Sequence, residues 1–403
     1  MNQTLAPPPP PPTDSSQPSS MAPPPTPELF DVLVEEVLLR FPPEDPASLL
    51  RAALVCKRWH RLVSGRHFRR RFRGFHRTPP MLGAIVNNHG FVSTSSFRCQ
   101  VPAELLRGCM VLDARHGRVL FHSVSWASQP RDPTLYLWNP ISGEKLELPK
   151  LPLVPDPHRG SSNFAVLCAA AGCNHLDCSH GPFLVVAVVV SRSETFARVY
   201  SSEHGEWSDP TFAPHINDSL VKVVEGLGEI IDSLDLMPGV LVGDAVYFLL
   251  HTMDAVLQFN LTTRDMAIIH LPDTIYSRPI ALLATEDGNL GFAGTKERTL
   301  HLWSRVAGPG EETWSQSRVI ELEKLLPVNA IKRTPIMLGS VGVIFLYTCD
   351  GGIYSVDLKS SKAREMPDRI GIPDYVVPFM SFCTPALGAA PTDEEPSGST
   401  SSA

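Results

Sequence analysis

The chain has 403 residues, of which 43% are hydrophobic, enough for the core of one large domain or of two to three ordinary ones. A net charge of −7 excludes the strongly basic surface that coats nucleic acid or binds membranes. The longest strongly apolar run, Phe183–Val190, is far shorter than the ~20 residues that span a bilayer, and no basic region followed by an apolar one opens the sequence. We therefore expect a soluble cytoplasmic or nuclear protein, or one found in both compartments, whose eight cysteines are free thiols.

The two ends of the chain have compositions that cannot form a core. Residues 1–26 are mostly Pro, Ser and Thr, with an unbroken proline run from Pro7 to Pro12, and residues 391–403 are small and polar. Such segments bury too little apolar surface to offset the entropy of ordering. We expect both to be disordered tails, the first with polyproline-like character.

Residues 27–65 carry a helical pattern. Leu29, Leu33 and Val37 lie on one apolar face of a first helix, which Pro42-Pro43 ends. Asp45-Pro46 is typical of an N-cap followed by proline at the first helical position, so a second helix begins there. In residues 49–64 (LLRAALVCKRWHRLVS) apolar residues recur at three- and four-residue spacings with basic residues between them, which predicts an amphipathic helix.

Residues 66–80 form a basic segment. Arg66–Arg77 interleaves six arginines with three phenylalanines, a mixture that can bind RNA through phosphate contacts and ring stacking. One short patch on an acidic chain more often is a linker helix, with its phenylalanines packed on the following domain and its arginines in water. We favour the linker helix and keep the RNA interpretation, with a nuclear localisation signal at Arg69–Arg73, as the alternative.

Residues 81–390 are rich in short predicted strands punctuated by Gly, Asp, Asn and Pro, and they contain an internal repeat. Val246–Thr263 aligns without a gap to Val343–Ser360, and Thr134–Pro149 is a third copy. Each copy has two strands, an Asn or Asp that opens a turn, and a third strand that ends at a proline. Weaker copies occur at Phe183–Trp207 and Leu290–Leu322, and a sixth unit combines Met81–Phe97 with Tyr375–Thr384.

These patterns predict an α+β multi-domain chain. A small helical domain is followed by an all-β, β-propeller-like domain of five to six blades, each of four strands. An irregular β-sandwich is the weaker alternative, because repeats of this length are typical of propellers.

Residues 168–180 contain the best metal candidates of the sequence: Cys173, His175, Cys178 and His180. Thiolate and imidazole are suitable zinc donors, but the two Cys-x-His spacings are tighter than those of most zinc fingers. We therefore expect no metal, and purified protein with substoichiometric zinc. We expect no cofactor either, and no catalytic residue, since the chain lacks the common nucleophile, metalloprotease and phosphate-binding motifs.

The run from Leu29 to Ser64 (LFDVLVEEVLLRFPPEDPASLLRAALVCKRWHRLVS) resembles the F-box of the large plant families in which a β-propeller-like domain follows. The VCKRW core, with Leu-Leu six residues before it, carries most of the resemblance. The family usually begins with Leu-Pro, whereas this chain has Leu29-Phe30. The resemblance implies that the helices dock on a Skp-type adaptor, and through it on a cullin. The implied adaptor-facing and supporting residues are Leu29, Phe30, Leu33, Val37, Leu50, Leu54, Val55, Cys56 and Trp59.

The function implied is that of a non-catalytic substrate receptor in a Skp/cullin/F-box ubiquitin ligase. Trp59 is the expected anchor, because buried aromatic side chains dominate such interfaces. The propeller would bind a target protein whose identity the sequence does not give. The alternative is a nucleic-acid-associated scaffold that uses Arg66–Arg77 and is not coupled to ubiquitination.

Overall fold

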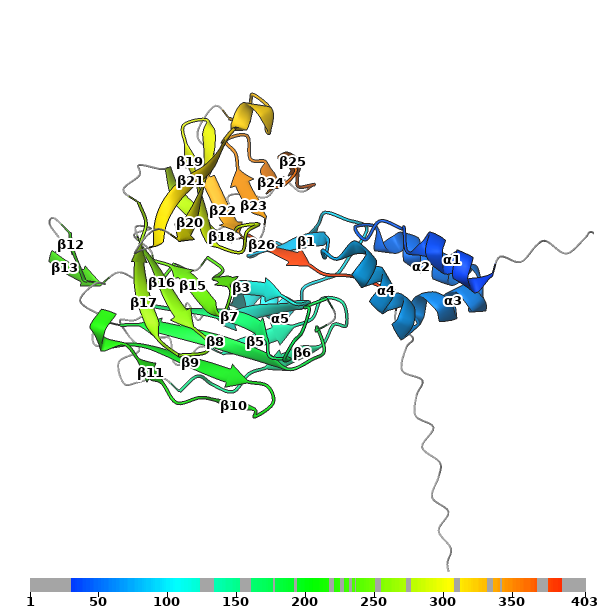
Figure 1. The fold of residues 1–403 in the computed structure, drawn as a ribbon, viewed down its shortest axis with the longest axis horizontal. Helices are drawn as coiled ribbons and strands as arrows, with labels where there is room; N and C mark the ends of the chain where they lie inside the picture. The colour runs from blue at the N-terminus through cyan, green and yellow to red at the C-terminus, as the bar shows by residue number, and fades with distance from the viewer. Residues whose placement is uncertain are drawn as a thin grey trace, which may run out of the picture.

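The structure is a computed structural model of the chain with two parts, a unit of four helices and a ring of β-sheets (Figure 1). The described residues are 30–123, 134–152, 161–176, 178–191, 194–216, 221–224, 228–231, 234–235, 237–250, 255–272, 277–307, 312–331, 336–340, 343–367 and 376–385. Among these residues, every helix is too short or too polar to cross a membrane. The sequence segments 1–26 and 391–403 lie outside the described residues, so their predicted disorder stays a prediction.

The four helices of the helical unit are α1 (Asp31–Leu38), α2 (Pro46–Val55), α3 (Lys57–Ser64) and α4 (Arg66–His76). Residues 49–64 do not form the single helix that their periodicity predicts. Cys56 is fully extended (φ −161°, ψ 163°) and separates α2 from α3. Its sulfur accepts a hydrogen bond from the Trp59 backbone N–H at 3.5 Å, which caps the new helix.

Asp45 and Pro46 begin α2 as predicted, although the Asp45 carboxylate makes no capping bond. Its two oxygens instead accept hydrogen bonds from the hydroxyl groups of Ser48 and Ser96, each at 2.5 Å. Because Ser96 follows the second strand of the ring, this carboxylate links the helical unit to the sheets. These hydrogen bonds hold the pKa of Asp45 below its usual range.

Helix α4 is part of the helical unit. Phe68 and Phe72 are buried in one cluster with the inward side chains of α1, α2 and α3, so they do not pack on the sheets as expected. Phe382, from the C-terminal segment after the last strand, joins the same cluster and meets the Phe72 ring edge-on, with 6.2 Å between the ring centroids. The two ends of the described chain therefore meet at α4.

The strands form a six-bladed propeller, and most blades are four-stranded antiparallel sheets. Blade 1 contains β3 (Cys109–Arg115), β4 (Arg118–Ser123), β5 (Leu135–Trp138) and β6 (Lys145–Glu147), preceded by a short helix, α5 (Ala103–Gly108). Blade 2 contains β7 (Ser161–Cys168), β8 (Phe183–Val190), β9 (Thr195–Ser201) and β10 (Glu206–Trp207), with β11 (Thr211–Phe212) also paired to β9. A separate hairpin, β12 (Val221–Val224) and β13 (Gly228–Ile231), follows blade 2.

The remaining blades follow in chain order. Blade 3 contains β14 (Val240–Val242), β15 (Ala245–Leu249), β16 (Ala255–Asn260) and β17 (Met266–His270). Blade 4 contains β18 (Ser277–Ala284), β19 (Leu290–Lys296), β20 (Thr299–Ala307) and β21 (Glu312–Glu321). Blade 5 contains β22 (Ile336–Ser340), β23 (Ile344–Tyr347), β24 (Ile353–Asp357) and β25 (Lys362–Glu365). The five blades that the sequence repeats predict are confirmed.

Blade 6 closes the ring with strands from both ends of the chain, as the sequence predicts. It contains β1 (Met81–Val86), β2 (Gly90–Ser93) and β26 (Val376–Met380). β1 lies between β2 and β26, and Ile85 pairs with Val377 in the antiparallel register. This blade has three strands in the described chain rather than the four expected.

The core of the propeller lies between the blades. Each pair of neighbouring blades shares one apolar cluster, and the six clusters run from blade 1 through blade 6 and back to blade 1. Strand β8 shows why the sequence contains an unbroken apolar run. Its Val185 and Ala187 face blade 1, whereas Val186 and Val188 face blade 3, so both faces of the strand are buried.

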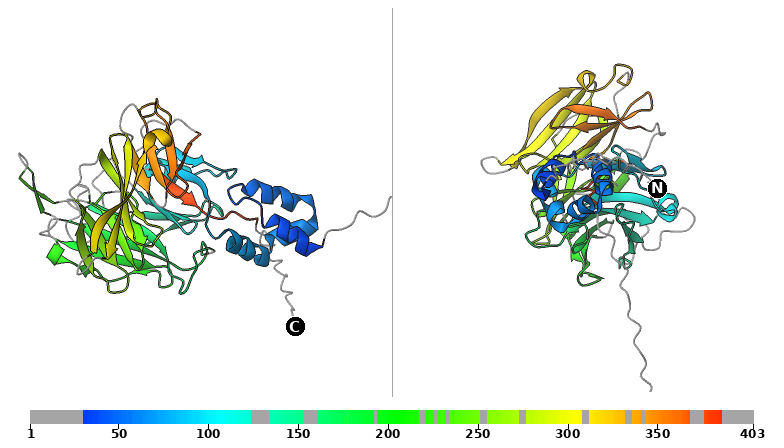
Figure 2. Two further views of the ribbon diagram at one scale, coloured as in Figure 1. Left: turned by 45° about the horizontal axis from the view of Figure 1, so that its top comes forward. Right: turned by 90° about the vertical axis from the view of Figure 1, so that its right-hand side faces the viewer.

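The helical unit stands apart at one side of the ring. Figure 2 shows this from two further directions, with the helices in front of the strands in the right-hand view. The contacts that join the two parts include the Asp45–Ser96 hydrogen bond and the Phe72–Phe382 ring contact.

Candidate protein-binding surface

Helix α1 is apolar on two faces. Val34 and Leu38, four residues apart, point into the shared cluster and are buried. Leu33 and Val37, also four residues apart, are exposed, and Phe30 just before the helix is 77% exposed. A helix that only supported a core would carry polar residues on this outer face.

Helix α2 repeats the arrangement. Leu49 and Ala53 pack inward, while Leu50 and Leu54 lie outward, and Leu54 is 82% exposed. Val55 and Cys56 at the end of the helix are exposed as well. The exposed apolar side chains of α1 and α2, together with Phe30, are called the F face below: Phe30, Val32, Leu33, Val37, Leu50, Leu54 and Val55.

The F face stands out from the rest of the surface. Of the fourteen large apolar side chains that are exposed in the described residues, seven belong to the F face, within residues 30–55. The other seven are distributed over α4 and the propeller. Concentrations of apolar side chains in water, unlike single ones, mark sites where another molecule binds.

Trp59 lies on α3. The side chain is half-buried and packs against the cluster that Leu49, Ala53 and Val63 form. One part of the ring therefore supports the helical unit, and the other part is accessible to a partner.

Ion pairs fix α1 on the neighbouring helices. Asp31 pairs with Arg58 of α3 at 2.6 Å. Arg71 of α4 contacts Glu35 at 3.0 Å and Glu36 at 2.5 Å. The Arg71 guanidinium holds the pKa of the Glu36 carboxyl below its usual range. The two glutamates therefore join α1 to α4.

The structure places the sequence-predicted adaptor residues as follows. Leu29 lies outside the described residues. Phe30, Leu33, Val37, Leu50, Leu54, Val55 and Cys56 are exposed, and Trp59 is half-buried. Sequence reasoning missed Val32, which is exposed beside Leu33. The available signal was that α1 has more apolar residues than one inward stripe needs.

In the basic segment, residues 66–80, fewer phenylalanine and arginine side chains are available to contact RNA than the sequence indicates. Phe68 and Phe72 are buried and cannot stack on bases, and only Phe75 is exposed. Arg71 is paired with the two glutamates of α1, and Arg73 is buried.

The cysteine-rich loop between β7 and β8 brings together a set of metal-binding side chains that differs from the expected one. The donor atoms of Cys168, Cys173, His175 and Cys178 all lie within 4.8 Å of one another. His180, which the sequence analysis included, lies elsewhere, with its Nδ1 3.8 Å from the Glu144 carboxylate.

Two protein-family models match the chain and agree with this architecture. Residues 27–71 match the F-box domain, and residues 110–386 match the family described as F-box protein AT5G49610-like, beta-propeller. No curated protein matches the chain. Among solved structures, Sqt1 of Saccharomyces cerevisiae is 12% identical over 70% of this chain and 76% of its own, with a TM-score of 0.32. AztD of Citrobacter koseri is 12% identical over 73% of this chain and 81% of its own, with a TM-score of 0.33.

F-box domains generally bind Skp-type adaptors, and proteins that combine an F-box with a propeller are generally non-catalytic adaptors. The propeller match alone covers more than half of the chain and the F-box match precedes it. The chain therefore belongs to the plant F-box protein family in which an F-box is followed by an AT5G49610-like β-propeller.

Proposed function

We propose that this protein is the substrate receptor of a Skp/cullin/F-box ubiquitin ligase and performs no catalysis itself. In this function the F face and the accessible part of Trp59 bind the Skp-type adaptor, which links the protein to a cullin. The propeller binds the target protein.

The observation that supports this proposal best is the exposure of the F face. Two helices expose apolar side chains on the side opposite to their own core, at the positions that the family resemblance implies. Burying a Leu or Phe side chain that is otherwise in water is favourable by ~1.5–3 kcal/mol. A partner that covers several of them gains enough to offset the cost of association.

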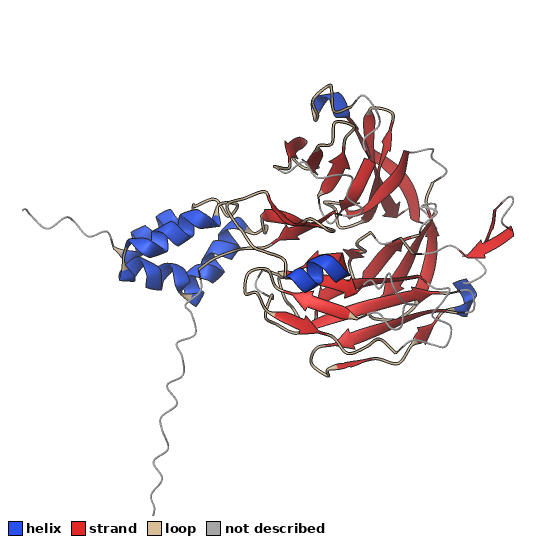
Figure 3. Ribbon diagram, turned by 180° about the vertical axis from the view of Figure 1, so that it is seen from behind, coloured by secondary structure: helices blue, strands red, loops and turns tan. Residues whose placement is uncertain are grey.

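The arrangement of the two parts is compatible with adaptor binding by the helical unit and target binding by the propeller. Figure 3 shows the four helices at one end of the molecule and the propeller at the other. An adaptor on the helices would leave the propeller loops free to contact a target. The aromatic contact between Phe72 and Phe382 and the Asp45–Ser96 hydrogen bond hold the helical unit on the propeller.

Calorimetric titration of the full chain with a purified Skp-type adaptor tests the proposal. We expect Leu54→Glu to weaken adaptor binding at least ~30-fold, since a buried carboxylate would replace an apolar contact and ~1.4 kcal/mol corresponds to tenfold. Because Leu54 is 82% exposed and outside the core cluster, the thermal stability should stay unchanged. Trp59→Ala should weaken binding as strongly and also lower stability, since Trp59 contributes to both.

Val328→Glu is the matched control, because Val328 is 75% exposed but lies in the propeller domain. This variant should bind the adaptor like the wild type. Absence of binding by the wild-type chain, or unchanged binding by Leu54→Glu, would refute the proposal.

The nucleic-acid scaffold is the alternative. Its base-stacking interpretation loses two of its three aromatic rings to the helical core. A salt titration of RNA binding distinguishes the two functions, because phosphate contacts weaken steeply as salt rises. We expect no RNA binding at moderate salt, where the adaptor complex should persist.

A further inference from the structure

Three cysteines and one histidine from the β7–β8 loop converge in blade 2. Cys168 is the last residue of β7, and Cys173, His175 and Cys178 follow in the loop. Backbone hydrogen bonds shape the loop, from Cys173 N to Ala170 O at 3.3 Å and from Gly181 N to Cys178 O at 3.1 Å. The four donor atoms lie within 4.8 Å of one another although they span eleven residues.

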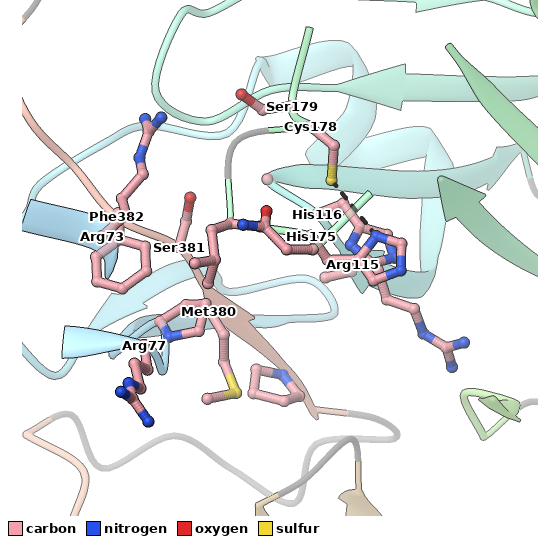
Figure 4. Close-up of a pocket in the computed structure, with 16 residues that line it drawn as sticks. Arg73, Arg77, Arg115, His116, His175, Cys178, Ser179, Met380, Ser381 and Phe382 are labelled. Atoms are coloured by element: carbon pink, nitrogen blue, oxygen red, sulfur yellow. Dashed lines mark hydrogen bonds between the residues drawn. The ribbon is translucent and has the colours of Figure 1, made fainter. Parts of the chain in front are cut away.

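These distances are close to those of a tetrahedral zinc site. Zn–S bonds of ~2.3 Å place two tetrahedral sulfur ligands roughly 3.8 Å apart, and the Cys₃His donor set is one of the common structural sets. The Cys178 sulfur is already 3.9 Å from Nδ1 of His175, and the dashed line in Figure 4 marks this contact. A contraction of about one ångström would bring the four donor atoms onto one ion.

The two tight Cys-x-His spacings argue against zinc at the level of the sequence. They no longer count against a zinc site when Cys168 takes the place of His180 in the ligand set. The ligand pattern becomes Cys-x₄-Cys-x-His-x₂-Cys, in which the cysteines are separated by four residues each. Both of these gaps are of the size found between the paired ligands of zinc fingers. The tight Cys-x-His step is accommodated because His175 adopts a left-handed backbone conformation (φ 58°).

The surroundings provide a compensating charge. Zinc binding releases three thiol protons, so a Zn²⁺ ion with three thiolates and a neutral imidazole carries a net charge of −1. Arg118, only 5% exposed, donates a hydrogen bond to the carbonyl oxygen of Gly181 and lies over the Phe183 ring. Its Nη1 atom is buried without a hydrogen-bond partner.

The same loop contacts the helical unit. Leu176, between the ligands His175 and Cys178, packs against the apolar cluster that contains Phe72 of α4 and Phe382. Beside this contact lies a cavity of about 320 Å³, and Figure 4 shows Arg73, Phe382, His116 and His175 among the residues that line it. The packing between the helical unit and the propeller is therefore incomplete. The contact between them depends on the position of the loop that carries Leu176.

We propose that Cys168, Cys173, His175 and Cys178 form a structural zinc site, and that the ion fixes Leu176 against the helical unit and so orients the F-box relative to the propeller. The zinc is coordinated by all four side chains and has no catalytic part.

Metal analysis of the full chain, expressed with zinc and purified under reducing conditions without a chelator, tests the site. We expect close to one zinc per chain in the wild type. Cys168→Ser should bind zinc at least ~100-fold more weakly in competition with a chelator, since loss of a ligand should cost more than loss of an outer hydrogen bond. Cobalt reconstitution of the metal-free wild type should give the visible bands of a tetrahedral site with thiolate ligands.

Two variants serve as controls. His180→Gln should keep the zinc, because His180 lies at Glu144 and away from the cluster, and Cys349→Ser should keep it because Cys349 is an exposed cysteine in blade 5. A wild type that carries no zinc and gains none on titration would overturn the proposal. So would zinc loss in His180→Gln with retention in Cys168→Ser, or a disulfide among these cysteines under reducing conditions.

Hydrogen exchange tests the coupling. Removal of zinc should raise the exchange rate of α4 amides at least ~10-fold, because local opening of α4 becomes easier when Leu176 is released. The amides of blade 4, which is distant in the ring order, should keep their rates. Unchanged exchange in α4 after zinc removal would contradict the orienting role.

Discussion

Single polar side chains connect consecutive blades. Oδ1 of Asn87, after β1, accepts a hydrogen bond from the backbone of Val111 in β3, and Asp113 of β3 accepts one from Val166 of β7, both at 2.9 Å. Asn163 of β7 donates to the carbonyl oxygens of Asp235 and Met237, at 2.6 and 2.9 Å. Because these side chains are almost fully buried, each bond is made in a region of low dielectric.

We expect Asn163→Ala to lower the free energy of unfolding by ~2–4 kcal/mol. The substitution leaves two buried carbonyl groups without their donor, and each unsatisfied buried group costs ~1–3 kcal/mol. Urea unfolding followed by circular dichroism measures the change. Asn329→Ala, at an exposed position, is the matched control and should change stability by less than ~0.5 kcal/mol. Equal stability of the two variants would show that the connection between blades 2 and 3 contributes nothing.

The side chain of His122 on β4 gives the protein a pH-dependent stability. Burial lowers the pKa of His122 from 6.5 to about 4, and its ring stacks on Phe164. A histidine whose pKa is lowered in the folded state stabilises above pH 6.5, and this contribution is lost as the pH falls from 6.5 towards 4. As the pH falls through this range, protonation of His122 in the unfolded chain should lower the free energy of unfolding by up to ~3 kcal/mol.

Unfolding measured at pH 7 and pH 4.5 should therefore differ less in His122→Phe than in the wild type. The control is His204→Gln at an exposed turn, which should keep the wild-type pH dependence. An identical pH dependence in His122→Phe and the wild type would show that His122 titrates normally.

At the scale of elements, the blades repeat one turn. Asn139, Asn260 and Asp357 each accept two backbone N–H hydrogen bonds, from the second and third residues after them, at 2.8–3.2 Å. The fourth residue after each has a positive φ: Gly143, Arg264 and Ser361. The side chain thus forms the turn that joins the third strand of the blade to the fourth.

Arg264→Gly should stabilise the protein by ~1 kcal/mol. Its φ of 65° costs an L-residue ~1–2 kcal/mol. Glycine avoids this cost, as Gly143 does at the matching position, and adds a smaller entropy cost of ~0.5–1 kcal/mol. Thermal unfolding measures the gain. Thr263→Gly in the same turn is the control and should destabilise, because glycine there only adds entropy to the unfolded chain. A lower melting temperature for Arg264→Gly would contradict this account of the turn.

For the whole molecule, ring closure is the decisive contact. Strand β26 pairs with β1 and carries Val376, Val377 and Phe379, which are buried between blade 6 and its two neighbours. Its residues are separated from β1 by nearly the whole propeller sequence. Each apolar cluster of the propeller lies between two neighbouring blades, and each blade contributes to two clusters. Loss of one strand of blade 6 therefore weakens two interfaces between blades.

A chain that ends at residue 375 should unfold at a temperature at least ~10 °C lower than the full chain. It loses four large buried side chains, Val376, Val377, Phe379 and Phe382, at ~2–5 kcal/mol each, which is comparable to a typical total of ~5–15 kcal/mol. Circular dichroism during heating measures the change. A chain that ends at residue 390, the domain boundary predicted from the sequence, should melt like the full chain. If both truncated chains melt alike, β26 does not close the ring.

The sequence by itself determined the order of the parts and the type of most elements. The helical spacing of residues 27–65, the repeats at Val246 and Val343, and the pairing of the chain ends were all readable from it. These patterns are periodic and local, because a strand or helix that is buried on one side shows its own repeat in the sequence. The F-box was readable from its resemblance to a known family, which rests on the VCKRW core and the Leu-Leu six residues before it.

Only the tertiary structure decided which apolar residues are exposed and which distant side chains meet. Helix α1 is apolar on both faces, so its sequence could not distinguish Val34, which is buried, from Leu33, which is exposed. The break at Cys56 depends on one backbone conformation within an otherwise helical pattern. Cys168 joins the metal-binding set and His180 does not, because the β7–β8 loop folds back on the strand end. Such contacts depend on three-dimensional distance, to which sequence spacing is only a partial guide.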